Sequence, residues 1–229
     1  MNLTYSTKKS SQDVQSLSIP KESFTYKLVS YFFVFPLFRF LFKGKTSGNL
    51  NVPIQGSLVV VANHGSYLDP PILGHALGRP LAFMAKAELF KIPLLAQIIR
   101  ACGAYPVSRG AGDREAIRVA SEKLRQGWAT GVFLDGTRQR NGRVNKPRAG
   151  AALLAARTGS PLLPVAIINS HRAFAKKSRF FQITPVHLRI GKLIPPPKST
   201  KKVDLEQTNK VLQEAINAML DLGLISGNN

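Results

Sequence analysis

A histidine and an aspartate stand five residues apart, at His64 and Asp69, directly after the apolar run at residues 58–62. The run predicts a buried strand, and open α/β sheets build their sites beyond the carboxyl ends of such strands. In a Ser-His-Asp triad the histidine takes a proton from a hydroxyl, and the acid orients the imidazole. Without an enzyme serine as nucleophile, the natural hydroxyl to activate is the substrate's own. The pair therefore predicts direct acyl transfer to an alcohol, although a lone histidine before a turn is more often structural.

Polar residues follow three further predicted strands, where a parallel sheet would bring them to one edge. Arginine binds phosphate through two parallel hydrogen bonds, and lysine binds it as a point charge. A glycine permits close approach of the backbone, and its N–H could steady a tetrahedral oxyanion. Taken singly, each such arginine is as often a surface residue, and each such glycine a plain turn. The candidates for substrate binding are Lys86, Arg109, Asp135, Gly136, Thr137 and Arg138, with Lys146 as a further candidate for phosphate.

Short apolar runs alternate with helical patterns, which predicts an α/β fold with a largely parallel mixed sheet flanked by helices. The clearest helical pattern runs from Asp113, an N-cap residue type, to Gln126, just before Gly127. Further helices are expected at residues 149–157 and 205–222. Strands are expected at residues 58–62, 81–85, 104–107, 130–134 and 162–168, with two more between 180 and 194.

The charge of the chain is strongly and locally positive. Of its 229 residues, 32 are Lys or Arg and 12 are Asp or Glu, which gives a net charge of +20. Between Gly136 and Val203 there are fifteen Lys or Arg and no acidic residue. Such a field attracts nucleic acid, anionic lipid headgroups or phosphorylated small molecules. Nucleic-acid binding would also call for aromatic side chains among the cations, and the phenylalanines cluster elsewhere, so no nucleic-acid partner is expected.

The cysteine and histidine content argues against metal chemistry. Cys102 is the only cysteine, which excludes an intrachain disulfide and a cysteine-based metal site. No cluster of His, Cys and acidic residues has metal-ligand spacing, so no metal is expected. His75, His171 and His187 have no partner pattern, and we interpret them as structural or exposed.

The segment Leu28–Phe42 is strongly apolar and contains six phenylalanines. It falls short of the roughly 20 apolar residues that span a bilayer, and Pro36 and Arg39 interrupt it. Lysines flank it on both sides. This pattern predicts one helix, or two short helices, lying in the membrane interface with the lysines toward anionic headgroups. The alternative is a core helix of the domain that follows.

Four motifs resemble the glycerolipid acyltransferase family, specifically the lysophosphatidic acid acyltransferases (1-acylglycerol-3-phosphate O-acyltransferases). The resemblance covers about residues 55–170, and four motifs in the right order are far more specific than one. The first family motif is Asn-His-x-x-x-x-Asp, and the second is a segment that ends in an arginine. The third is typically Phe-Pro-Glu-Gly-Thr-Arg, and the fourth is a proline in a buried strand. They are matched by Asn63, His64 and Asp69, by Arg109, by Phe133, Gly136, Thr137 and Arg138, and by Pro164.

The third motif departs from the family at two positions. Leu134 stands where the family has proline, and Asp135 stands where it has glutamate. Aspartate keeps the charge but shortens its reach by one methylene. The change either alters the role of this acid or marks a subgroup with a different acceptor.

The resemblance implies an enzyme that moves a fatty acyl group from a thioester donor to the free hydroxyl of lysophosphatidic acid, forming phosphatidic acid in phospholipid biosynthesis. His64 would be the general base, oriented by Asp69, because histidine exchanges protons near neutral pH. A thioester is already activated, so no cofactor is implied. The donor would be acyl-coenzyme A or acyl carrier protein, and the other partners a membrane phospholipid surface and the lysophospholipid acceptor.

The organisation that follows has three parts. Residues 1–22 are polar and are expected to be a disordered tail, residues 23–46 a membrane anchor, and residues 47–229 the acyltransferase domain. A polar linker is expected at residues 46–53. The protein would associate with a membrane on its cytoplasmic face.

Three other functions fit parts of the pattern. An acyltransferase of the same family could act on another lysolipid or on glycerol 3-phosphate. The same His-Asp pair could activate water instead, which would give a thioesterase. A non-enzymatic basic protein that binds nucleic acid or membrane would leave the segment Asn63–Asp69 unexplained.

Overall fold

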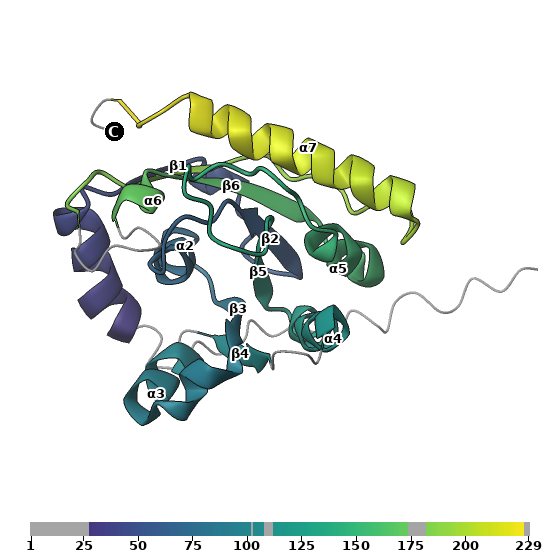
Figure 1. The fold of residues 1–229 in the computed structure, drawn as a ribbon, viewed down its shortest axis with the longest axis horizontal. Coiled ribbons are helices and arrows are strands. Elements are labelled where there is room, and N and C mark those ends of the chain that lie inside the picture. The colour runs from purple at the N-terminus through teal and green to yellow at the C-terminus, as the bar shows by residue number, and fades with distance from the viewer. Residues whose placement is uncertain (1–27, 102, 108–111, 174–181, 227–229) are drawn as a thin grey trace, which may run out of the picture.

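The computed structural model contains a seven-stranded sheet with helices on both faces (Figure 1). It describes residues 28–101, 103–107, 112–173 and 182–226. The strands lie in the order β1-β7-β6-β2-β5-β3-β4, and every neighbouring pair is parallel except β6 and β7. The expected mixed, largely parallel sheet is confirmed. The strands are β1 (Lys45–Ser47), β2 (Leu58–Ala62), β3 (Leu81–Lys86), β4 (Ala104–Val107), β5 (Ala129–Phe133), β6 (Leu162–Ile168) and β7 (His187–Ile190).

The strand β2 lies inside the sheet, between β5 and β6. All five of its side chains are fully buried. Leu58, Val60 and Ala62 contribute to the core on one face, and Val59 and Val61 to the core on the other. A strand covered on both faces must be apolar throughout, which is why the sequence shows a continuous run instead of alternation.

Two strands at one edge run against the other five. β7 pairs antiparallel with β6, and β1 pairs parallel with β7. We expected residues 46–53 to be a linker, but Lys45–Ser47 already form a strand, and three polar residues carry no apolar signal. We expected two strands between residues 180 and 194, but the described part of that segment contains only β7 and an isolated bridge at Ile194. Fewer residues of this segment pair in the sheet than its apolar residues suggested.

Two sets of helices cover the two faces of the sheet (Figure 1). α2 and the N-terminal helical segment pack on one face, whereas α4, α5 and α7 pack on the other. The helices expected at residues 113–126, 149–157 and 205–222 are confirmed to within three residues at each end. The helical elements are η1 (Ser30–Val34), η2 (Leu37–Leu41), η3 (Asn49–Asn51), α2 (Asp69–Ala76), η4 (Ala87–Lys91), α3 (Pro93–Ala101), α4 (Gly112–Arg125), α5 (Gly150–Thr158), α6 (Ser170–Ala173) and α7 (Lys202–Asp221).

The N-terminal apolar segment forms a continuous helical stretch over residues 28–41 that includes η1 and η2. Both elements have π-helical bonding, and Pro36, which has no N–H to donate, lies between them. Val34, Phe38 and Phe42 follow one another at four-residue spacing, so they share one face. All three are buried, and Phe38 and Phe42 belong to the same core cluster as β2.

The opposite face of this helix is apolar and open. Tyr31, Phe32, Phe33 and Phe40 are each between 66% and 72% exposed. One face therefore belongs to the domain core, as the second alternative expected, and the other face is left uncovered. The interfacial role expected for the helix stays a prediction. Among the described residues, no helix has the length and apolar character needed to cross a bilayer.

His75 of α2 contacts this helix. The Ser30 hydroxyl lies 2.9 Å from His75 Nδ1, and the rings of Tyr31, Phe35 and Phe38 surround the imidazole. Burial lowers the pKa of His75, because it disfavours the charged form of the ring. We expected this histidine to be structural or exposed, and these contacts give it a structural role.

Two phenylalanines of this helix, one buried and one exposed, test whether the helix packs on the sheet. Phe38→Ala should lower the free energy of unfolding by about 3–5 kcal/mol, because it empties a buried site in the core. The matched control Phe40→Ala removes an exposed ring and should change that free energy by less than about 0.5 kcal/mol. Urea denaturation measures both, and equal values for the two variants would mean that the helix does not pack on the sheet.

Candidate active site

The segments that follow β2 and β5 emerge side by side. The two strands are parallel neighbours, with Ala62 opposite Phe133, so both chains leave the sheet at the same edge. His64 comes two residues after β2, and Gly136 three residues after β5. The N–H of Gln139 donates to His64 O at 2.8 Å. The first and third motifs of the sequence are therefore joined into one site.

A histidine–aspartate pair lies at the centre of this site. His64 Nδ1 is 2.7 Å from Asp69 Oδ2. An ionised carboxylate only accepts hydrogen bonds, so Nδ1 is the donor and Nε2 is the ring nitrogen available to a substrate. Asp69 Oδ2 also accepts the N–H groups of Gly65 and Ser66, both at 2.8 Å. Asp69 is fully buried, whereas the His64 side chain is 17% exposed.

The position of Asp69 follows from the local sequence. Asp69 is the first residue of α2, and an acidic side chain is favoured at the positive end of a helix. Pro70 and Pro71 come next and suit the first turn, where N–H groups have no helical acceptor. Leu68 N–H donates to Ser66 Oγ at 3.2 Å and tightens the turn before the helix. The turn therefore places the Asp69 carboxylate beside the His64 ring.

The ring of His64 is supported by Phe133. Their centroids are 3.9 Å apart, and the rings are nearly parallel, at 11°. Phe83 of β3 lies 5.7 Å behind Phe133 in a similar orientation. The stack restricts the plane of the imidazole, and the hydrogen bond to Asp69 restricts its rotation. The sequence identified Phe133 only as part of a motif, and its position at the end of a strand beside β2 was the available signal.

Asn63 holds three segments together beneath the pair. Its side chain donates to Gly142 O at 2.7 Å and to Ile167 O at 2.9 Å, and it accepts the N–H of Ile167 at 2.7 Å. Asn63 is completely buried, so these bonds satisfy an amide that would otherwise be costly to bury. The asparagine of the first motif is therefore a structural link between β2, β6 and the loop around Gly142.

Gly136 forms a turn directly after β5. Its φ of +65° lies in the left-handed region, which favours glycine. Its N–H donates to Phe133 O at 2.9 Å. This bond already engages the N–H that we expected to steady an oxyanion, so that role does not fit the structure. A Cβ on Gly136 would lie 2.9 Å from Arg148 Cδ, which means that the Arg148 side chain crosses the turn.

Asp135 points away from the surface and fastens a loop. It is buried, its Oδ1 accepts the N–H groups of Asn145 at 3.1 Å and Lys146 at 2.6 Å, and Leu134 O accepts the N–H of Arg148 at 2.8 Å. We refer to residues 139–148, which carry four cations, as the basic loop. The geometry gives the Asp135 carboxylate a positioning role in this loop.

The far side of the basic loop is fastened to α7. Val144 N–H donates to Asn217 Oδ1 at 3.1 Å, and Val144 O accepts from the side chains of Asn217 and Gln213, both at 3.0 Å. Arg143 forms an ion pair with Asp221. The loop is thus fixed before any ligand binds, a preorganisation that lowers the entropic cost of binding.

Arg138 lies over the ring of Tyr67. Its Cζ is 3.5 Å from the ring centroid, well within the range of a cation–π interaction. Tyr67 belongs to the turn between His64 and Asp69, so the predicted phosphate-binding arginine is in direct contact with the turn that carries the base. The sequence had given Tyr67 no role.

Four predicted site residues have no described contact that assigns them a role. Thr137 is exposed beside Gly136, and Lys146 is exposed on the basic loop. Lys86 is the last residue of β3, at the same edge of the sheet, and its side chain lies outside the described part. Arg109 lies outside the described residues altogether. The roles expected for these four residues stay predictions.

Two other histidines have structural surroundings. A Cβ on Gly65 would lie 2.7 Å from His171 N, so α6 packs tightly against the turn after His64. Burial lowers the pKa of His171, and Arg172 lowers it further, whereas Asp69 acts in the opposite direction. His187 Nδ1 accepts the N–H of Ile225 at 2.8 Å. Within the described ranges, no group of three or more His, Cys, Asp and Glu could hold a metal ion.

Comparisons with known proteins give a consistent result. A family model described as Acyltransferase matches residues 43–168, more than half of the chain. The structure of the 1-acyl-sn-glycerophosphate acyltransferase PlsC from Thermotoga maritima is similar with a TM-score of 0.75 and 30% sequence identity, over 88% of this chain and 81% of that one. This likeness agrees with the expected sheet flanked by helices.

Two curated relatives are similar in sequence. A 1-acyl-sn-glycerol-3-phosphate acyltransferase of Borreliella burgdorferi is 29% identical over 154 residues, which cover 65% of this chain and 60% of the relative. A chloroplast 1-acyl-sn-glycerol-3-phosphate acyltransferase of Brassica napus is 28% identical over 150 residues, which cover 64% of this chain and 42% of the relative. The chain therefore spans less than two thirds of the length of either relative.

The positioning role of Asp135 can be tested by hydrogen exchange. Asp135→Ala should lower the free energy of unfolding by about 1.5–3 kcal/mol, because it leaves two backbone N–H groups without a charged acceptor. Amide exchange at Asn145 and Lys146 should accelerate selectively. The control Glu206→Ala removes an exposed carboxylate on α7 and should leave both measurements unchanged. Unaltered exchange at the two amides in Asp135→Ala would refute the role.

Proposed function

The chain belongs to the acyltransferase family, and from this premise we propose that it transfers a fatty acyl group from a thioester donor to the free hydroxyl of lysophosphatidic acid, giving phosphatidic acid. The observation that carries the proposal is the 2.7 Å contact between His64 Nδ1 and the buried Asp69 carboxylate. Both curated relatives are named 1-acyl-sn-glycerol-3-phosphate acyltransferases, which supports this acceptor.

The proposed reaction is a single acyl transfer. His64 Nε2 takes the proton of the acceptor hydroxyl as the hydroxyl oxygen attacks the thioester carbonyl carbon. The tetrahedral intermediate collapses with cleavage of the carbon–sulfur bond, and the imidazolium returns the proton to the departing thiolate. Asp69 stabilises the imidazolium, and the stacked ring of Phe133 holds the plane of the His64 imidazole. The thioester supplies the activation, so no covalent enzyme intermediate is needed.

The acceptor's phosphate would be held by cations near the turn after β5. Arg138 and Arg148 lie on or across this turn, and neither forms an ion pair with an acidic side chain among the described residues. A phosphate monoester carries roughly −1.5 to −2 charges at neutral pH, so it fits such a site well. Lys86, Arg109 and Lys146 are further proposed contacts. The donor's carrier, coenzyme A or acyl carrier protein, is anionic in either case and would meet the same positive field.

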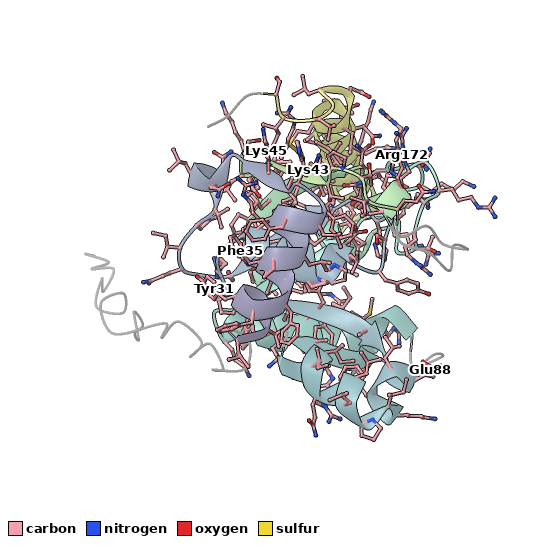
Figure 2. All side chains as sticks on the ribbon, turned by 90° about the vertical axis from the view of Figure 1, so that its left-hand side faces the viewer. Tyr31, Phe35, Lys43, Lys45, Glu88 and Arg172 are labelled. Atoms are coloured by element: carbon pink, nitrogen blue, oxygen red, sulfur yellow. The ribbon has the colours of Figure 1, made fainter. Side chains whose placement is uncertain are left out.

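The exposed aromatic face of the N-terminal helix supports association with a membrane surface, and we propose the cytoplasmic face. Figure 2 views the molecule from this side, with Tyr31 and Phe35 on the helix and Lys43 and Lys45 near its end. Large aromatic side chains beside lysines are typical of interfacial helices that bind anionic lipid. An acceptor that resides in a bilayer would then be reached without crossing water.

The catalytic pair predicts a loss of rate without a loss of folding. His64→Ala should reduce acyl transfer by about 10²–10⁴-fold, because a positioned base acts in the chemical step. Asp69→Asn should also be severe, since its amide would favour the wrong tautomer. The measurement is transfer to lysophosphatidic acid from acyl-coenzyme A and from acyl carrier protein, with products identified by mass spectrometry. A His64→Ala variant that retains most of its activity would exclude the base assignment.

The same assay separates the proposed function from its alternatives. The wild-type protein should release free thiol from the donor only when an acceptor is present, whereas a thioesterase would release it without one. Preferred acylation of another lysolipid or of glycerol 3-phosphate over lysophosphatidic acid would overturn the proposed acceptor. Circular dichroism of each variant shows whether folding is retained.

The aromatic face predicts binding to vesicles. Replacing Phe32, Phe33 and Phe40 together by serine should weaken binding to vesicles that contain anionic phospholipid by at least about tenfold, because these rings would no longer bury apolar area in lipid. Stability should change little, since the three rings are 68–72% exposed. The matched control replaces the exposed residues Leu50, Val203 and Leu222 by serine and should leave vesicle binding unchanged. Equal binding of the two triple variants would locate the lipid contact elsewhere.

A further inference from the structure

The contact between Arg138 and Tyr67 joins two parts of the site that have separate chemical tasks. Tyr67 lies in the turn that carries His64 and Asp69, and Arg138 lies in the turn after β5. The Arg138 Cζ is 3.5 Å from the Tyr67 ring centroid, so the guanidinium lies over the face of the ring. Cation–π stacking of this kind is strongest when the cation is partly removed from water.

The stacked guanidinium has a donor without an acceptor. Arg138 Nη1 is buried and has no hydrogen-bond partner among the described residues. A buried charged donor is costly to leave unsatisfied, and the face of an aromatic ring attracts the cation without accepting its in-plane N–H groups. An anion bound in the plane of the guanidinium would satisfy such a donor, and two parallel N–H groups match two oxygens of a phosphate.

The ring beneath the guanidinium belongs to a rigid turn. Asp69 Oδ2 accepts the N–H groups of Gly65 and Ser66 at 2.8 Å, and Leu68 N–H is bound to Ser66 Oγ. These bonds fix the backbone on both sides of Tyr67. The same carboxylate oxygen also orients His64 at 2.7 Å. One turn therefore sets the position of the base and of the surface on which the arginine rests.

We propose that Tyr67 is a positioning residue that holds Arg138 to receive the acceptor's phosphate monoester, and so fixes the distance between that phosphate and His64. This inference rests on the proposed function. It explains how the site selects a hydroxyl on the carbon next to the one that bears the phosphate, because a rigid spacing admits one hydroxyl position. It also disfavours lysolipids whose phosphate is a diester, since the additional headgroup removes charge and one free oxygen.

Binding of a soluble acceptor without donor tests the proposal directly. The probe is 1-hexanoyl lysophosphatidic acid, with affinity measured by calorimetry at fixed ionic strength. Tyr67→Leu should weaken binding by about three- to tenfold, in line with the strength of a cation–π contact. Tyr67→Phe keeps the ring and should stay within about twofold of wild type. Equal weakening in both variants would assign the effect to the hydroxyl, and unchanged binding in Tyr67→Leu would also overturn the proposal.

A double-mutant cycle shows whether Tyr67 acts through Arg138. Arg138→Ala alone should weaken binding at least as much as Tyr67→Leu, and adding Tyr67→Leu to Arg138→Ala should cause little further loss. If the fold-losses of the two single variants multiply in the double variant, Tyr67 contacts the ligand independently of Arg138. That result would refute the positioning role. The control Arg157→Ala removes an exposed arginine of α5 and should leave binding unchanged.

Kinetics separate this inference from the proposed function. Tyr67→Leu should raise KM for lysophosphatidic acid severalfold, and should reduce the preference for it over lysophosphatidylcholine by a similar factor, with Tyr67→Phe restoring both. A wild-type protein that binds the probe through Tyr67 and Arg138 but transfers no acyl group would refute the proposed function alone. Acyl transfer with a KM that is independent of Tyr67 would refute the positioning role alone.

Discussion

The buried carboxylate of Asp69 is the constraint on which the rest of the site depends. A charge that is fully removed from water must be matched by donors, and Oδ2 has three of them within 2.8 Å. Satisfying that oxygen folds the turn after β2, starts α2 and directs the His64 ring. Because these hydrogen bonds close the turn, they also fix the backbone of Tyr67, whose ring lies against Arg138.

A second constraint is the adjacency of β2 and β5, and both departures from the family motif lie directly after β5. Leu134 N–H donates to Ala62 O at 3.0 Å and extends the pairing of the two strands by one bond, which a proline could not do. Asp135 then lies close enough to the basic loop for a short side chain to accept its backbone N–H groups. Leu134 and Asp135 thus both bond to the scaffold around the turn after β5.

The N-terminal helix shows how one apolar segment can serve two environments. Phe38 and Phe42 complete the core on one face of the sheet, while Phe32, Phe33 and Phe40 stay exposed. The boundary expected at residue 46 falls within β1, and Phe38 and Phe42 lie in one core cluster with β2. Removing the helix would therefore uncover the core on this face of the sheet.

The sequence by itself determined the features that depend on near neighbours in the chain. The five-residue spacing of His64 and Asp69 specifies a single turn, and the apolar runs specify buried strands and hence a largely parallel sheet. Tertiary structure alone decided which distant residues meet: Phe133 beneath His64, Asn63 bonded to Gly142 and Ile167, and Tyr67 beneath Arg138. It also decided that Gly136 N–H closes a turn and that β1 and β7 run antiparallel to the other strands, because strand pairing and side-chain contact across the sheet leave no local pattern in the chain.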